Sequence, residues 1–172
     1  MRRLFMISMG LVITSLALTI QLRAQSSDPA GAAVLEFKTL AAVRGPFVGA
    51  NNPIRGVPGG GLPWVIADGR GSLKAGGKLE VHVKGLVLAD DPTVPANLRL
   101  TNPIPFFRAI VSCMIINGSG NPDFVNVSTA GYPADPSGDA NIEETVPLPS
   151  ECFAPIVLVA SPAGSWFAVT GR

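Results

Sequence analysis

The segment Lys78–Leu88, KLEVHVKGLVL, decides the fold class because its residues alternate between apolar and polar. Leu79, Val81 and Val83 are each followed by a charged residue or a histidine. Successive side chains of a β-strand point to opposite faces, so this alternation predicts a strand with one buried face and one wet face. Gly85 then interrupts the alternation, which predicts a bulge or a bend.

The same pattern extends outward from this segment. Val34–Lys38 alternates in the same way, with Leu35 and Phe37 expected to face inward. Phe107–Ile116 is almost continuously apolar, which is typical of a central strand covered on both faces. Further strands are expected at Trp64–Ala67, Phe124–Thr129, Ala140–Leu148, Ile156–Ala160 and Trp166–Thr170.

Clusters of Gly, Pro, Asn and Asp separate these strands and predict turns, at Asn51–Pro53, Pro58–Pro63, Asp68–Gly71, Asn117–Pro122 and Pro133–Asp139. The longest such region, Asn51–Pro63, is expected to be a mobile loop. Helical periodicity is hard to find in this part of the chain. Short strands with frequent turns predict an all-β fold, an antiparallel β-sandwich of immunoglobulin-like architecture.

The length of the chain limits the number of domains, and its charge limits the kinds of partner it can bind. The chain has 172 residues, of which 15% are charged, and a formal net charge of +1. Without the arginines at positions 2, 3 and 23, 10 basic and 12 acidic residues remain, a net charge of −2. The basic residues are also scattered singly. We therefore expect one domain over residues 27–172 and no binding of nucleic acid.

The first 26 residues predict a signal peptide. Arg2 and Arg3 precede the uncharged stretch Leu4–Ile20, and small residues follow at Ala24 and Ser26. This order of positive charge, apolar stretch and small residues is that of a secretory signal, with cleavage expected after residue 24 or 26. The sequence therefore predicts an exported protein, secreted or periplasmic, with no stable membrane insertion after cleavage.

Retention of this segment as an uncleaved anchor is the alternative. Its 17 uncharged residues are at the lower limit for crossing a bilayer. Arg2-Arg3 also loosely resembles a twin-arginine signal, but the strong hydrophobicity of the next residues favours the general secretion route. No Cys lies near the cleavage site, which excludes a lipid anchor on such a cysteine.

Cys113 and Cys152 are the two cysteines of the chain. An even number of cysteines in an oxidising compartment predicts a disulfide. A cysteine nucleophile would need a nearby base and a zinc site would need four ligands, and a chain with one histidine supplies neither well. We expect a structural disulfide, with no cofactor and no metal.

The catalytic motifs are weak. His82, the single imidazole, lies by alternation on the polar face between Glu80 and Lys84, so a solvated histidine is expected rather than a catalytic base. Gly59-Gly60-Gly61 precedes a strand, whereas a phosphate loop precedes a helix. No catalytic or cofactor-binding residue is therefore predicted.

Three weaker patterns leave alternatives open. Acidic pairs occur at Asp90-Asp91 and Glu143-Glu144, and the segment Asp135–Asn141 offers oxygen ligands for a weak calcium site or, equally, an Asp-capped turn. Asn117 and Asn126 begin formal glycosylation sequons. The aromatic residues are interpreted either as a sugar-stacking platform or as a lid of the core, and the lid is favoured: Trp64, Trp166 and Phe167.

Four segments together resemble a family of exported bacterial β-sandwich proteins without an assigned activity: Gly61–Trp64, Gly77–Leu88, Phe107–Cys113 and Gly164–Ala168. They span most of the mature chain. Gly71-Ser72-Leu73 and Leu79–Leu86 are also similar to chordin-type (CHRD) domains. The resemblance implies an exported β-sandwich and assigns no site residues.

These observations favour a non-enzymatic, exported module that binds an extracellular or periplasmic ligand or serves a structural role. A secreted hydrolase or carbohydrate-active protein is the first alternative, and it requires an exposed aromatic side chain beside two carboxylates. A calcium-binding adhesion module is the second, and it requires Asp139 and its neighbours to hold the ion.

Overall fold

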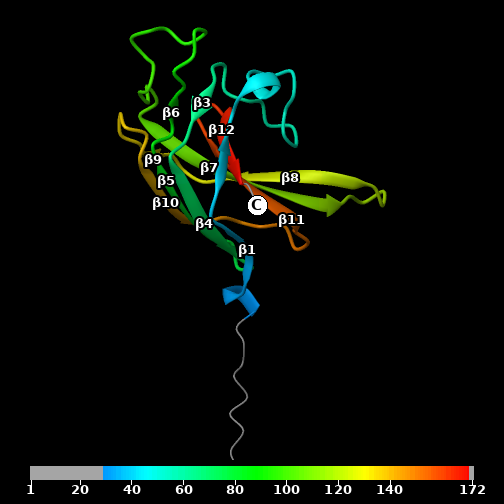
Figure 1. Ribbon diagram of the computed structural model, residues 1–172. Helices are drawn as coiled ribbons and strands as arrows, with labels where there is room; N and C mark the ends of the chain where they lie inside the picture. Colours follow the sequence, from blue (N-terminus) through cyan, green and yellow to red (C-terminus); the bar gives the residue numbers. More distant parts are fainter. Residues whose placement is uncertain (1–28, 171–172) are drawn as a thin grey trace, which may run out of the picture.

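The computed structural model describes residues 29–170, which form two antiparallel sheets packed against each other (Figure 1). The four-stranded sheet contains, in spatial order, β1 (Ala33–Phe37), β4 (Asp68–Lys74), β5 (Lys78–Lys84) and β10 (Ala140–Thr145). The six-stranded sheet contains β2 (Leu40–Ala42), β12 (Trp166–Thr170), β11 (Phe153–Ala160), β7 (Phe106–Ile116) and β8 (Pro122–Ser128), with β9 (Tyr132–Pro133) also paired to β7. The predicted all-β sandwich is confirmed.

Smaller elements complete the fold. β3 (Trp64–Val65) and β6 (Val87–Leu88) form a two-stranded ribbon, and 3₁₀ turns occur at Pro29–Gly31 and Gly45–Phe47. The predicted signal peptide, residues 1–26, lies outside the described residues. Among residues 29–170, no helix is long and apolar enough to cross a membrane.

The alternation of β5 has the predicted consequence. Leu79, Val81 and Val83 are buried against the other sheet, while Lys78, His82 and Lys84 are exposed. Gly85, with φ +62°, ends the strand, and the chain then enters the separate ribbon at Val87. The expected interruption is therefore a bend that transfers the chain from one sheet to another.

The prediction of a turn at Asp68–Gly71 was wrong, because these residues begin the central strand β4. Gly69 and Gly71 are there for close packing. A Cβ on Gly69 would lie 2.5 Å from Leu40 Cδ1, and one on Gly71 would overlap the Glu80 carbonyl oxygen. Glycine thus lets β4 pass close to its neighbours. In the sequence, glycines needed for close packing give the same pattern as glycines of a turn.

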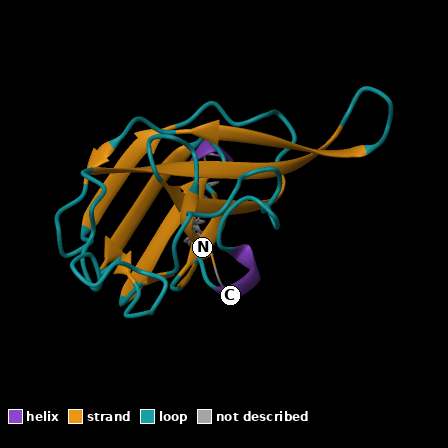
Figure 2. Ribbon diagram, turned by 90° about the horizontal axis from the view of Figure 1, so that it is seen from above, coloured by secondary structure: helices purple, strands orange, loops and turns teal. Residues whose placement is uncertain are grey.

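The hairpin of β7 and β8 extends beyond the rest of the molecule (Figures 1 and 2). From Ala109 to Cys113 β7 is buried on both faces, as expected of a central strand. Beyond Cys113 the two strands form an arm, defined as residues 114–124. Ile116 and Phe124 on this arm are 52% and 46% exposed.

Residues 44–63, called the strap below, lie against the six-stranded sheet and contact β12, β7, β11 and β8. The predicted loop over Asn51–Pro63 is present, and backbone hydrogen bonds attach it to the sheet. The Gly60 amide donates to the Trp166 carbonyl (2.8 Å), and the Trp166 amide donates to the Pro58 carbonyl (2.9 Å). Val57 is a buried residue of the strap.

Arg55 attaches the strap to the root of the arm. Its guanidinium donates to the carbonyls of Ser112 (2.8 Å) and Ala154 (2.9 Å) and lies over the Phe124 ring, 5.3 Å from its centroid. Asn126 donates in return to the Arg55 carbonyl at 3.0 Å. Burial lowers the pKa of the Arg55 side chain, which stays charged because guanidinium is so strong a base.

These contacts occur where β11 is irregular. Between Phe153 and Ile156 its register on β7 shifts, and Ala154 adopts φ +41°. Pro155 has no N–H to donate to the sheet, so the side chain of Arg55 supplies donors in this region. The predicted disulfide between Cys113 and Cys152 is confirmed and lies next to this bulge, with a Cα–Cα distance of 4.8 Å.

Candidate functional site

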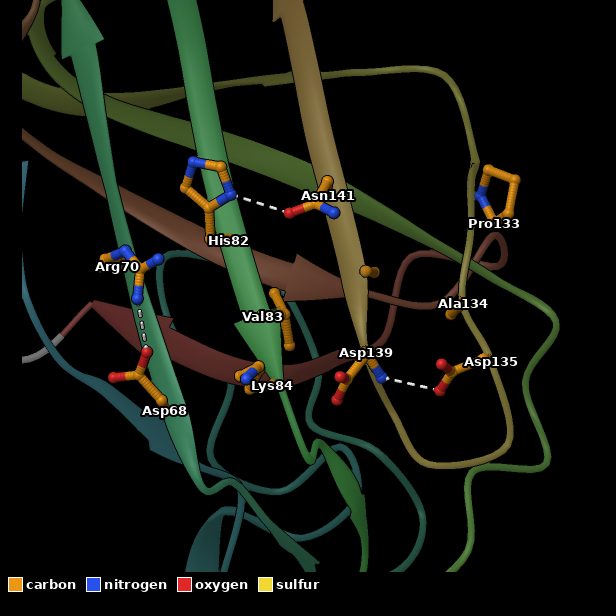
Figure 3. A pocket seen from close by; sticks show the side chains of 11 residues that line it. Asp68, Arg70, His82, Val83, Lys84, Pro133, Ala134, Asp135, Asp139 and Asn141 are labelled. Atoms are coloured by element: carbon orange, nitrogen blue, oxygen red, sulfur yellow. Dashed lines mark hydrogen bonds and ion pairs between the residues drawn. The ribbon is translucent and has the colours of Figure 1, made fainter.

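A polar cavity of about 510 Å³ lies on the outer face of the four-stranded sheet (Figure 3). Its floor is formed by β4, β5 and β10, and one wall is formed by the segment 133–139, which leads from β9 into β10. The side chains on the floor are there because alternate residues of these strands face away from the core. The cavity has the size of a site for a small ligand.

A row of three hydrogen-bonding side chains crosses the floor. Arg70 is in register with His82, and His82 is in register with Asn141. His82 Nδ1 lies 2.7 Å from Asn141 Oδ1 (Figure 3). Because an amide oxygen only accepts, Nδ1 carries the hydrogen in this arrangement, and Nε2 is left to accept from a ligand.

The charged groups of the floor differ in their pairing. Arg70 donates to Asp68 Oδ2 at 2.9 Å, and both side chains are largely exposed, so this pair contributes little to stability. Lys84, in register with Asp68, forms no ion pair with any residue between 29 and 170. Its ammonium group is therefore available to a ligand.

The wall of the cavity carries two carboxylates. Asp135 Oδ1 accepts from Ser137 Oγ at 2.6 Å and from the Asp139 amide at 3.0 Å. These bonds, first that from Ser137, lower the pKa of Asp135 from its ordinary value of 3.8 and keep the group ionised. Asp139 Oδ1 accepts from the Gly85 amide at 2.8 Å and so fixes the wall to the bend after β5.

The calcium interpretation of Asp135–Asn141 gains no support from this arrangement. One oxygen of each carboxylate accepts hydrogen bonds that hold the turn, as the alternative interpretation of an Asp-capped turn expects. Within the described part of the chain, no three residues of the types His, Cys, Asp or Glu are close enough together to hold a metal ion.

His82 is exposed, as its place in the alternation predicts. In a hydrolytic triad a carboxylate orients the imidazole and stabilises its charged form. Here the partner of the ring is the neutral amide of Asn141. The geometry is suited to hydrogen bonding with a ligand rather than to activating a nucleophile.

The aromatic residues lie away from the cavity, in the core. Trp64, Trp166 and Phe167 are between 2% and 5% exposed, and the rings of Trp64 and Phe167 stack with centroids 4.1 Å apart. Phe107 packs edge-on against both of these rings. None of the three can present a ring face to a sugar, so the interpretation as a core lid holds and the stacking platform does not.

The glycine run 59–61 is part of the strap. A Cβ on Gly59 would overlap the Phe47 carbonyl oxygen, and one on Gly60 would lie 2.9 Å from Phe167 Cδ1. Gly59 is also bridged to Trp166 of β12. The run therefore permits close packing of the strap on the sheet, and no helix follows it.

The other residues singled out in the sequence have structural partners. Asp91 accepts hydrogen bonds from the amide and hydroxyl of Thr93, and Asp90 pairs with Arg99 at 3.5 Å. Glu144 accepts from the Ala130 amide, and Glu143 pairs with Lys78 at 3.2 Å. Asn117 Oδ1 accepts from two amides of the turn at the tip of the arm.

Sequence reasoning missed Arg70 as a member of a site, and it considered Asn141 only within the candidate calcium segment Asp135–Asn141. Arg70 fell in the segment predicted as a turn, and Asn141 gains its role only from the register of β10 on β5. The available signal was the outward-facing set of β5, which correctly placed His82 and Lys84 on one polar face.

Comparisons with known proteins add no further information. No family model, no curated protein and no solved structure matches the chain. The resemblance to exported bacterial β-sandwich proteins and to chordin-type domains therefore stays a prediction, and the functional argument depends on the site itself.

Proposed function

We propose that this protein is a non-enzymatic, exported binding module that holds a small polar ligand in the cavity on its four-stranded sheet. The observation that carries the proposal is the set of uncommitted polar groups around that cavity. Within the part of the chain that the structure describes, Lys84 and the Asn141 amide nitrogen have no acceptor, and His82 Nε2 has no donor. A concave site with several converging polar groups is the usual form of a small-molecule site.

Export is supported by the disulfide. Cys113 and Cys152 are joined, and disulfides persist in oxidising compartments outside the cytoplasm. The predicted signal peptide at residues 1–26 agrees with this compartment. A secreted or periplasmic location remains part of the proposal.

Binding is favoured over turnover by the partners of the reactive groups. His82 is oriented by an amide, and Asp135 and Asp139 each hold the turn with one oxygen. The candidate aromatic platform of Trp64, Trp166 and Phe167 is buried. A carbohydrate-active enzyme would need an exposed ring beside two carboxylates. The residues around the cavity include no Phe, Tyr or Trp.

The test is a binding screen on the purified exported protein. Amide chemical shifts are recorded by NMR with a panel of amino acids, short peptides, sugars and organic acids. We expect at least one class of compound to shift resonances of β4, β5 and β10, and the shifts to be lost in Lys84→Ala and Asn141→Ala. Lys74→Ala, on the same polar face but outside the cavity lining, is the matched control.

Two results would contradict the proposal. One is a panel in which no compound perturbs the cavity, or in which the cavity variants bind as well as the wild type. The other is reproducible turnover of a substrate that His82→Ala abolishes, because it would make the protein an enzyme.

A further inference from the structure

The charged side chains around the cavity differ between its two sides: the wall carries only carboxylates, whereas β4 and β5 carry Arg70 with its partner Asp68, and Lys84. The wall contributes Asp135 and Asp139, neither of which forms an ion pair within residues 29–170. The two carboxylates accept the hydrogen bonds from Gly85, Ser137 and the Asp139 amide through their Oδ1 atoms, so the second oxygen of each is directed to a ligand in our proposal. This end can accept hydrogen bonds from an ammonium group.

The opposite side of the floor offers donors. Arg70 on β4 uses one N–H on Asp68 and has further N–H groups. Asn141 lies instead on β10, next to the wall, and its amide nitrogen has no partner in the described structure. Lys84 on β5, between β4 and the wall, contributes an ammonium group that forms no ion pair within residues 29–170 (Figure 3). These groups can donate to a carboxylate.

The cavity also continues across the sheet. A second hollow of about 250 Å³ shares Arg70 and His82 with the first and extends to Glu36 and Lys38 beside β1. The two hollows adjoin at these two side chains and are together called the trough. A ligand that uses the trough is therefore expected to be extended, with polar groups along its length.

We infer that the trough binds short peptides with free termini, the α-ammonium at Asp135 and Asp139 and the carboxylate toward Lys84 and Arg70. This inference rests on the proposed function and specifies its ligand class. A peptide backbone also brings donors and acceptors at regular spacing, which fit the Nε2 of His82 and the amide of Asn141. Sugars lack both charges and find no ring to stack on here.

The experiment compares four probes on the exported protein by calorimetry and NMR: triglycine, triglycine amide, N-acetyltriglycine and N-acetyltriglycine amide. They share one backbone and differ in the terminal charges. Triglycine is expected to bind best, and loss of either charge to weaken binding about tenfold, as for one charge-assisted contact. The doubly capped peptide is expected to bind weakest.

Two variants assign the ends. Asp135→Asn keeps an oxygen that can accept from Ser137 and Asp139, so the turn is preserved while the charge is removed. It should weaken triglycine and triglycine amide and leave N-acetyltriglycine unchanged. Lys84→Ala should weaken the binding of triglycine and N-acetyltriglycine, which have a free carboxylate, and leave the binding of triglycine amide unchanged. Lys74→Ala should change neither, and thermal unfolding of each variant checks that the fold is intact.

The possible results distinguish a failure of the peptide assignment from a failure of the proposed binding function. Equal affinity for all four probes, or no peptide binding while a sugar or organic acid binds the cavity, overturns the peptide assignment and leaves the binding module standing. An absence of cavity ligands across the whole panel overturns both.

Discussion

The outer faces of the two sheets are opposite in character. The four-stranded sheet presents a charged, open face, on which Arg70, His82 and Lys84 line a cavity. The six-stranded sheet is covered in part by the strap, and apolar residues on it such as Leu158 and Trp166 are at most 2% exposed. The first face is free to bind, whereas the second needs a cover. We therefore expect substitutions on the covered face to change stability and those on the open face to change binding.

The cover is incomplete at the arm. Phe124, Met114 and Phe153 are neighbours across three strands of the outer face, and both phenylalanines are about half exposed. Arg55 lies at the boundary, with its guanidinium over the ring of Phe124. The strap therefore ends where the arm leaves the body of the sandwich, and the disulfide lies at the same place.

Loss of the disulfide is expected to have the largest effect on the covered side. In Cys113→Ala/Cys152→Ala the closed loop of 39 residues is opened, which should lower the free energy of unfolding by about 4 kcal/mol in the chain-entropy model. Urea denaturation of the variant and the wild type measures the difference. Reduction of the wild type should give a similar loss, and a change below about 1 kcal/mol in both would show that the bridge does not stabilise this sheet.

Gly59→Ala tests how tightly the strap lies on the sheet. The added methyl group would overlap the backbone oxygen of Phe47, and backbone cannot rotate away as a side chain can. We expect a loss of about 3 kcal/mol, at the upper end for overpacking. Gly61→Ala is the matched control, since a Cβ at that position meets nothing within 4 Å. Equal midpoints in urea for the two variants would contradict the described packing of the strap.

Arg55→Ala tests the boundary between cover and arm. The substitution removes two hydrogen bonds from a charged donor and the contact with Phe124, for an expected loss of about 2 kcal/mol. Arg55→Lys keeps the charge but not the two-pronged geometry, and it should recover less than half of the loss. Amide hydrogen exchange at β8 should rise in both variants. Full recovery by lysine would mean that charge alone matters there.

The fold could be predicted largely from local pattern. The alternation over Lys78–Lys84 and the apolar run of β7 identified two strands and the buried side chains of each. This is possible because successive side chains of a strand point alternately into and out of a sandwich. Strand β4 could not be found in this way. Gly69 and Gly71 are required by Leu40 and Phe37, which lie far away in the sequence and approach only after folding.

The candidate site was less predictable for the same reason. The outward orientation of His82 and Lys84 follows from one strand, but the row with Arg70 and Asn141 depends on the register of three strands. The role of Arg55 depends on a bulge in β11, ninety-nine residues away from it in the sequence at Ala154. Such contacts leave no local pattern, whereas the disulfide was predictable because the chain has only two cysteines.

The stability of the open face should depend on pH rather than on packing. Asp135 tests this, and its expected effect is the smallest of those predicted here. Hydrogen bonds from Ser137 and from the Asp139 amide lower its pKa below 3.8, so the folded state favours the ionised group. Its stabilising contribution is complete above the unfolded pKa and is lost as the pH falls through the folded pKa. Asp135→Asn should therefore be slightly less stable than the wild type at pH 7, and the difference should shrink below about pH 3.8.

Urea denaturation at pH 7, 5 and 3 measures this difference, and carbon NMR of the Asp135 carboxyl group measures the pKa directly. Ser137→Ala should move that pKa back toward its ordinary value, because it removes the largest cause of the shift. If the wild type and Asp135→Asn lost stability in parallel from pH 5 to pH 3, the turn would not depend on the ionised carboxylate. The hydrogen bonds of the turn would then not favour the ionised form of Asp135. The contrast between a covered face stabilised by packing and an open face stabilised by polar contacts would weaken.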